Sequence, residues 1–147
     1  MLRYHTVPVT PFQQNASIVW CDETREAAVI DPGGDLDHLL AEAQRLDVKL
    51  VQIWLTHAHI DHAGGTAELA KRLNLPIIGP HPGDQFWIDG LPQQSVMFGF
   101  PPAGHFTPTR WLADGDTVQI GHCTLHVRHC PGHTPGHVVF HSPDIQR

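Results

Sequence analysis

The stretch Val48–His62, which reads VKLVQIWLTHAHIDH, determines the expected fold and site. Its first part, Val48–Leu55, is a nearly continuous apolar run of the kind found in strands buried on both faces. After Thr56 the chain places three imidazoles and one carboxylate within six positions, at His57, His59, Asp61 and His62. Open α/β sheets bind ligands beyond the carboxyl ends of their central strands. The segment therefore predicts a functional site at the end of a buried strand.

The residue types in this cluster are those of a metal site. Zinc takes nitrogen and oxygen ligands, and a catalytic zinc keeps three protein ligands plus a water. If the extended backbone of the strand carries through the segment, His57 and His59 project to the same side and bind one ion. Asp61 and His62 then reach a second ion, and the glycines at 64 and 65 let the backbone pass close to the metals. The alternative is a solvated, histidine-rich turn or core histidines with backbone partners, which the density of imidazoles makes the weaker interpretation.

A second histidine-rich turn, HCPGHTPGH at His129–His137, follows another predicted strand. An imidazole from this turn is a candidate third ligand for the ion bound by His57 and His59. Chemistry alone does not select among His129, His133 and His137, nor does it exclude Cys130, because a thiolate is also a good zinc ligand.

The rest of the chain is typical of an α/β layered domain, and we expect one domain over residues 1–147. Asp35 is a candidate N-cap for a helix in which leucines and alanines recur at helical spacing through Leu46, and a second helix is expected at Thr66–Leu73. Residues 80–110, rich in Pro and Gly, are expected to be irregular and wrapped over their own aromatic side chains. The expected strands besides Val48–Leu55 are Leu2–Val9, Ala16–Cys21, Ala27–Asp31, Pro76–Gly79, Thr117–Ile120, Thr124–His129 and His137–His141.

Composition excludes several classes of function. The net charge is -6 with nine scattered Lys and Arg residues, so no basic face for nucleic acid is expected. No apolar run is long enough to cross a bilayer, and the first twelve residues lack the features of a signal peptide. Three cysteines without a CxxC pair argue against a disulfide framework and favour a cytoplasmic location. The thirteen histidines are unusual and point again to metal binding.

Together, THAHIDHAGG and HCPGHTPGH resemble the metallo-β-lactamase superfamily, and within it the type II glyoxalases, or hydroxyacylglutathione hydrolases. The opening VPVTPFQQNASIVW, the VIDPGGD turn, the IIGP strand and the DGD segment extend the resemblance over the whole chain. The resemblance implies an αββα sandwich, of which this chain is roughly the N-terminal two-thirds.

The resemblance also implies roles for single residues. It makes His57, His59 and His133 ligands of the first metal, and Asp61 and His62 ligands of the second. Asp61 would in addition act in catalysis by orienting the hydroxide. In this pattern Asp31 supports the site without binding metal, whereas His129 and His137 pack or hydrogen-bond locally.

The implied activity is hydrolysis of a glutathione thioester, of the S-lactoylglutathione type, by attack of metal-bound hydroxide. The partner is thus a small-molecule substrate, and neither nucleic acid nor a membrane. The expected cofactor is zinc, with one well-formed site and an incomplete second one, and three imidazoles accept iron or manganese as well.

The chain departs from the family at its end. Where this chain stops, after Ser142–Arg147, the family pattern adds a bridging carboxylate, a final histidine and the residues that bind glutathione. We therefore expect a domain that is incomplete at the C-terminus and that exposes apolar surface, which favours self-association. The alternatives are an inactive metal-binding remnant, a partial subunit, a β-lactamase or other hydrolase of this fold, and an iron-dependent sulfur dioxygenase.

Overall fold

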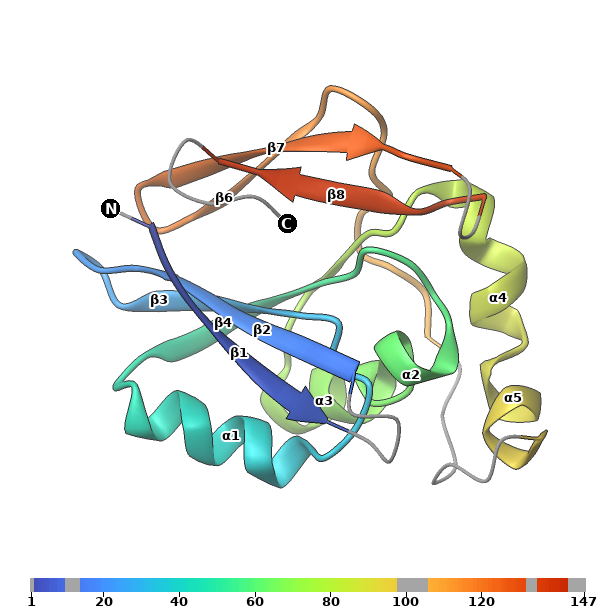
Figure 1. Ribbon diagram of the computed structural model, residues 1–147, viewed down its shortest axis with the longest axis horizontal. Helices are drawn as coiled ribbons and strands as arrows, with labels where there is room; N and C mark the ends of the chain where they lie inside the picture. The colour runs from blue at the N-terminus through green and yellow to red at the C-terminus, as the bar shows by residue number, and fades with distance from the viewer. Residues whose placement is uncertain (1, 10–13, 98–105, 132–134, 143–147) are drawn as a thin grey trace.

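The computed structural model describes residues 2–9, 14–97, 106–131 and 135–142, with the backbone alone for residues 8, 9, 14, 15, 60 and 61. In this part of the chain the elements form three layers, which are helices, a five-stranded sheet and a three-stranded sheet (Figure 1). No helix of the described residues is long and apolar enough to cross a membrane.

The five-stranded sheet has the order β1-β2-β3-β4-β5. The first three strands pair antiparallel, whereas β3, β4 and β5 run parallel to one another. Because parallel strands end at the same edge, the segments that follow β3 and β4 emerge side by side. The strands of this sheet are β1 (Leu2–Val9), β2 (Gln14–Cys21), β3 (Glu26–Ile30), β4 (Lys49–Trp54) and β5 (Ile77–Ile78).

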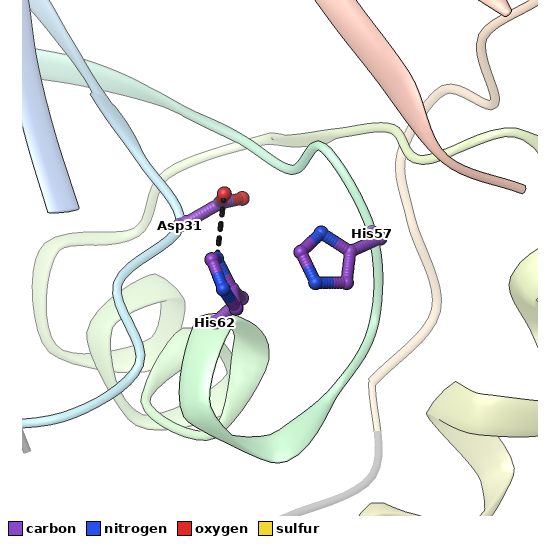
Figure 2. A group of neighbouring side chains, drawn as sticks. All are labelled: Asp31, His57 and His62. Carbon is purple, nitrogen blue, oxygen red and sulfur yellow. Dashed lines mark hydrogen bonds and ion pairs between the residues drawn. The ribbon is translucent and has the colours of Figure 1, made fainter. Parts of the chain in front are cut away.

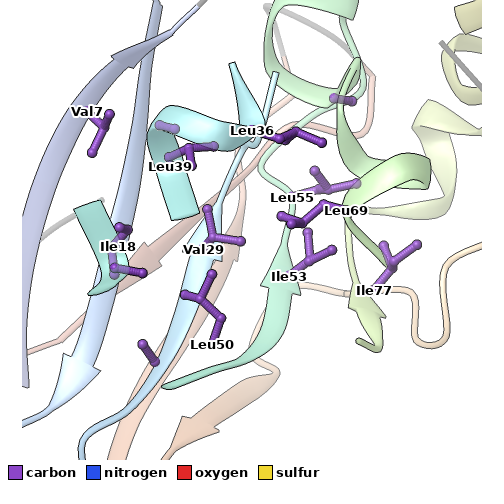
Figure 3. Close-up of a cluster of buried hydrophobic side chains, with 14 of the residues drawn as sticks. Val7, Ile18, Val29, Leu36, Leu39, Leu50, Ile53, Leu55, Leu69 and Ile77 are labelled. Atoms are coloured by element: carbon purple, nitrogen blue, oxygen red, sulfur yellow. The ribbon is translucent and has the colours of Figure 1, made fainter. Parts of the chain in front are cut away.

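Helices α1 (Leu36–Arg45) and α3 (Thr66–Leu73) cover one face of this sheet. Leucines at helical spacing, Leu36 and Leu39 among them, pack against Val29 and Ile53 of the strands (Figure 3). Asp35 stands at the predicted N-cap position but has a left-handed backbone (φ 49, ψ 46) and makes no capping hydrogen bond with its side chain. The helix and its N-cap position were therefore predicted correctly, although the Asp35 side chain does not cap the helix.

The opposite face of the sheet packs against the second sheet, formed by β6 (Thr117–Ile120), β7 (Cys123–His129) and β8 (Val138–His141), all antiparallel. Alternate residues of all three strands, such as Leu125 and Phe140, fill a second core between the sheets. The Trp54 ring lies 5.2 Å from that of Phe140, between ring centroids. On β4, Ile53 and Trp54 are both fully buried, one in each core. The prediction of a strand buried on both faces is confirmed for this part of β4.

The prediction of an irregular segment at 80–110 was wrong for much of its length. Three short helices occur here, namely η1 (Pro82–Asp84), α4 (Gln85–Asp89) and α5 (Leu91–Met97), while residues 98–105 lie outside the described part. Pro82 and Pro92 stand in the first turn of their helices, where no backbone N–H is needed, so they do not interrupt the helices. Of the aromatic residues that the structure describes in this segment, Phe106 is buried in the core, whereas Phe86 is 75% exposed.

Candidate metal centre

The loop after β4 positions the histidine cluster through backbone hydrogen bonds on both sides. The carbonyl of Thr56 accepts from the N–H of Val138 at 2.8 Å, which ties the loop to the second sheet. Extended backbone does not carry through the whole segment, because helix α2 (Ile60–Ala63) begins after His59. The carbonyl of His59 accepts from His62 and Ala63, at 3.0 and 2.8 Å. This helical turn brings the His62 ring back to 4.1 Å from the His57 ring, between centroids.

The imidazole of His57 is the centre of a group of rings. It is buried, at 3% exposure, and its centroid lies 5.2 Å from that of His59 and 5.0 Å from that of His137. His59 in turn contacts Trp87 of α4 edge to face, at 4.9 Å. His137, which the resemblance assigned to local packing, thus lies against the first histidine of the cluster.

A chain of hydrogen bonds fixes the orientation of His57. The hydroxyl of Thr56 lies 2.6 Å from Oδ2 of Asp31 and 2.9 Å from Nδ1 of His57. An ionised carboxylate can only accept, so the single hydroxyl hydrogen of Thr56 goes to Asp31. Nδ1 of His57 must then donate its hydrogen to the Thr56 oxygen, and the lone pair of the neutral ring resides on Nε2.

The same carboxylate orients His62 (Figure 2). Nδ1 of His62 lies 3.1 Å from Oδ2 of Asp31, so this nitrogen donates to the carboxylate, and in a neutral ring Nε2 bears the lone pair. Oδ1 of Asp31 accepts from the N–H of Thr56 at 2.8 Å. Ligating histidines usually donate their second nitrogen to a carboxylate or carbonyl, which fixes the tautomer and raises the basicity of the ligating nitrogen.

These residues fit a divalent cation. Ligand atoms of Asp31, His57 and His62 lie within 4.8 Å of one another, and Nε2 of His57 is fully buried. Both oxygens of Asp31 accept hydrogen bonds from Thr56 or His62. An Asp31 oxygen is thus close enough to both imidazoles to share an ion, and its hydrogen bonds also allow it to orient them.

The described part of the chain does not include every predicted site residue. The Asp61 side chain and the whole of His133 lie outside it, although the Asp61 backbone belongs to α2. Of the alternatives in the second turn, Nε2 of His129 donates to the Pro135 carbonyl at 2.8 Å, and Cys130 is exposed. Among the residues of that turn that the structure describes, His137 has a ring that reaches His57.

His129 also stacks on His81, with the rings nearly parallel and their centroids 3.8 Å apart. Partial burial, and next the charge of His129, lower the pKa of His81, while Asp84 acts in the opposite direction. Nδ1 of His81 accepts from the N–H of Gly83 at 3.0 Å, so the neutral ring caps helix η1. The lowered pKa therefore favours a neutral His81 imidazole beside the second turn.

Gly65, the second glycine after the cluster, is needed for close packing. A Cβ on Gly65 would stand 2.7 Å from the Pro32 carbonyl oxygen, in the DPGG turn, and 2.9 Å from Leu36. Gly65 is thus required by the close approach of α3 to the turn after β3. Three residues that shape the site were not identified from the sequence, namely Thr56, Asp84 and Trp87. They lie next to other motifs, but nothing else in the sequence indicates their roles.

Comparison with known proteins agrees with this geometry. Residues 9–144 match the family model of the Metallo-beta-lactamase superfamily. Hydroxyacylglutathione hydrolase GloC of Haemophilus influenzae is 40% identical over 135 residues, covering 91% of this chain and 63% of that protein. The chain therefore spans less than two thirds of the length of this curated relative.

Two solved structures share the fold. TTHA1623, crystallised in a di-iron-bound form, gives a TM-score of 0.82 at 36% identity, over 95% of this chain and 67% of that one. The B3 metallo-beta-lactamase BLEG-1 gives a TM-score of 0.81 at 31% identity, over 94% of this chain and 66% of that one. The predicted fold class is confirmed.

Proposed function

Because the chain belongs to the metallo-beta-lactamase superfamily, we propose that it acts as a metal-dependent hydrolase whose ion binds at the loop between β4 and α3. The observation that carries this proposal is the hydrogen-bond chain from Asp31 through Thr56 to His57, because it presents a buried Nε2 lone pair next to His59 and His62. A core histidine with only a packing role does not require this tautomer.

We assign the ligands from the family pattern, which is supported by the closeness of His57 to His59 and His62. His57, His59 and His133 would bind the first ion, and Asp61 and His62 the second. Asp31 would hold His62 and, through Thr56, His57. His137, whose ring contacts that of His57, would lie beside the first ion and exclude water from one side of His57.

A bound divalent cation supplies Lewis acidity toward a carbonyl oxygen and lowers the pKa of a coordinated water toward about 7. The residues of this chain supply the rest. The Asp61 carboxylate would orient the attacking water and accept its proton, while Asp31 prevents rotation of His62. Trp87, packed on His59, would form an apolar wall of the substrate site.

We propose a glutathione thioester as the substrate, on the support of the 40% identity to a protein named hydroxyacylglutathione hydrolase. A thiolate is a good leaving group, so the site needs no strong general acid. The imidazole donors suit zinc, and they suit iron as well, the metal of the TTHA1623 structure.

The test is hydrolysis of S-lactoylglutathione by the purified chain loaded with zinc, iron or manganese. Thioester loss above the metal-only blank is expected, and it should vanish in His57→Ala but persist in the control His122→Ala, which changes an exposed histidine. A β-lactam and an oxygen-consumption assay with iron distinguish the other chemistries of this fold. No turnover of any substrate, with roughly one metal ion per chain by elemental analysis, would refute the hydrolase and identify a metal-binding remnant.

A further inference from the structure

A buried carboxylate at the start of α4 joins the two loops of the candidate site. Asp84 is fully buried. Its Oδ2 accepts from the N–H of Ala58 at 2.9 Å, and its Oδ1 accepts from the N–H of Gly136 at 2.6 Å. Ala58 stands between His57 and His59, and Gly136 precedes His137. One side chain therefore contacts the backbone of both histidine-bearing loops.

The backbones are packed around this carboxylate without space to spare. A Cβ on Gly136 would lie 2.5 Å from the Asp84 nitrogen and 2.6 Å from the His81 carbonyl oxygen. The N–H of His81 also donates to the Gly136 carbonyl, at 3.2 Å. A Cβ on Gly83 would lie 3.0 Å from the carbonyl of Pro135. The distance between the loops is thus determined by direct contact through residues 81–84.

The chemistry of the two contacts requires a carboxylate. Both partners are N–H donors, so both side-chain oxygens must accept. An amide at this position offers one acceptor and one donor, and the donor would face an N–H. Burial of an ionised carboxylate is costly unless it is hydrogen-bonded, and hydrogen bonds to a charged acceptor are stronger than neutral ones. If this position only had to fill space, an apolar or neutral side chain would suffice.

We propose that Asp84 is a positioning residue that sets the spacing between the His57–His59 loop and the turn at 135–137, and through it the geometry of the metal centre. This role rests on the proposed function, since it assumes that imidazoles from both loops share an ion. Asp84 acts through the backbone N–H groups of Ala58 and Gly136.

The experiment compares Asp84→Asn with the control Asp89→Asn, which changes an exposed carboxylate at the other end of α4. Zinc affinity is measured by chelator competition, and the visible spectrum of the cobalt-loaded chain reports ligand geometry. We expect Asp84→Asn to weaken zinc binding about 10- to 100-fold and to alter the cobalt spectrum, as removal of a residue supporting metal ligands does. The control should match the unaltered chain in both.

Amide hydrogen exchange of the metal-free chain separates positioning from general destabilisation. In Asp84→Asn the N–H groups of Ala58 and Gly136 should exchange about 10- to 100-fold faster, whereas the strands β2, β3 and β7 keep their protection. If Asp84→Asn is too unstable to purify, Gly83→Ala keeps the carboxylate and displaces Pro135, and it should weaken zinc binding by a smaller factor.

The outcomes are distinct. Unchanged zinc affinity and cobalt spectrum in Asp84→Asn, or exchange that accelerates equally in all strands, would overturn the positioning role and leave the hydrolase proposal standing. Failure of the unaltered chain to bind zinc, iron or manganese would instead overturn the proposed function, while the exchange rates of the Ala58 and Gly136 N–H groups still test whether Asp84 joins the two loops.

Discussion

Replacement of Thr56 by valine tests the hydrogen-bond chain that orients the buried histidine. Valine has nearly the shape of threonine but lacks the hydroxyl that bridges Asp31 and His57. We expect Thr56→Val to lose stability and metal affinity together, because the same hydroxyl satisfies a buried carboxylate and a buried imidazole N–H.

The magnitude follows from the two contacts. The hydroxyl lies 2.6 Å from the Asp31 carboxylate, and a hydrogen bond to a charged group contributes about 1.5–3 kcal/mol. The donor left on His57, which is 3% exposed, adds a desolvation penalty of about 1–3 kcal/mol. The additional methyl of valine returns about 0.8 kcal/mol. We therefore expect the free energy of unfolding to fall by about 2–5 kcal/mol, a large share of the about 5–15 kcal/mol typical of a domain.

The assay is urea denaturation in the presence of a chelator, so that metal binding does not contribute to the measured stability. Thr56→Ser is the matched control, because it keeps the hydroxyl and loses only a methyl, and it should cost about 1 kcal/mol or less. Zinc affinity should fall about 10- to 100-fold in the valine variant and stay near that of the unaltered chain in the serine variant. Equal losses in the two variants, or a loss below about 0.5 kcal/mol in Thr56→Val, would refute the proposed hydrogen-bond chain and with it the assigned tautomer.

Three further changes test other parts of the structure. Gly65→Ala places a Cβ 2.7 Å from a carbonyl oxygen of the DPGG turn, so urea denaturation should show a loss of about 1–3 kcal/mol; a gain in stability would contradict this close approach. Burial, together with the charge of the stacked His129, lowers the pKa of His81, so the unfolded chain binds more protons there and stability falls as the pH drops through about 6.5. His81→Asn keeps an acceptor without the titration, so its melting temperature should fall less than that of the unaltered chain on acidification, and an identical fall would exclude His81 as a contributor. Phe140→Ala should cost about 3–5 kcal/mol in the same denaturation assay, against less than about 0.5 kcal/mol for the exposed Phe86→Ala, and similar losses would refute the core between the sheets.

The strands and the two long helices could be predicted because their signals are local. Alternation and helical spacing of apolar residues recur within a few positions, and the structure shows a strand at Leu2–Val9 and a helix at Thr66–Leu73 with the predicted bounds. The wrong predictions of secondary structure occurred where the same residues are typical of both a loop and the start of a helix. Prolines at 82 and 92 indicated a loop, but in the first turn of a helix they cost no hydrogen bond.

The candidate site was predictable only in part. The histidines themselves were visible in the sequence, and the position of Asp31 near them was expected from family resemblance. The partners that position them were not. Asp31 is 25 residues from Thr56, and Asp84 is 26 and 52 residues from the two amides that it binds. Contacts at such separations follow from the pairing of strands and the packing of layers, which have no local signature.

The amino-acid sequence by itself determined which atoms are available, namely a dense set of imidazoles and carboxylates placed after a strand that must be buried. Residue type and spacing are covalent properties, so chemistry of this kind can be inferred without coordinates. The tertiary structure decided which nitrogen of His57 carries the hydrogen, why His62 turns back toward it, and which buried carboxylate joins the two loops. Those features depend on the distances between segments that only the packed sheets and helices bring together.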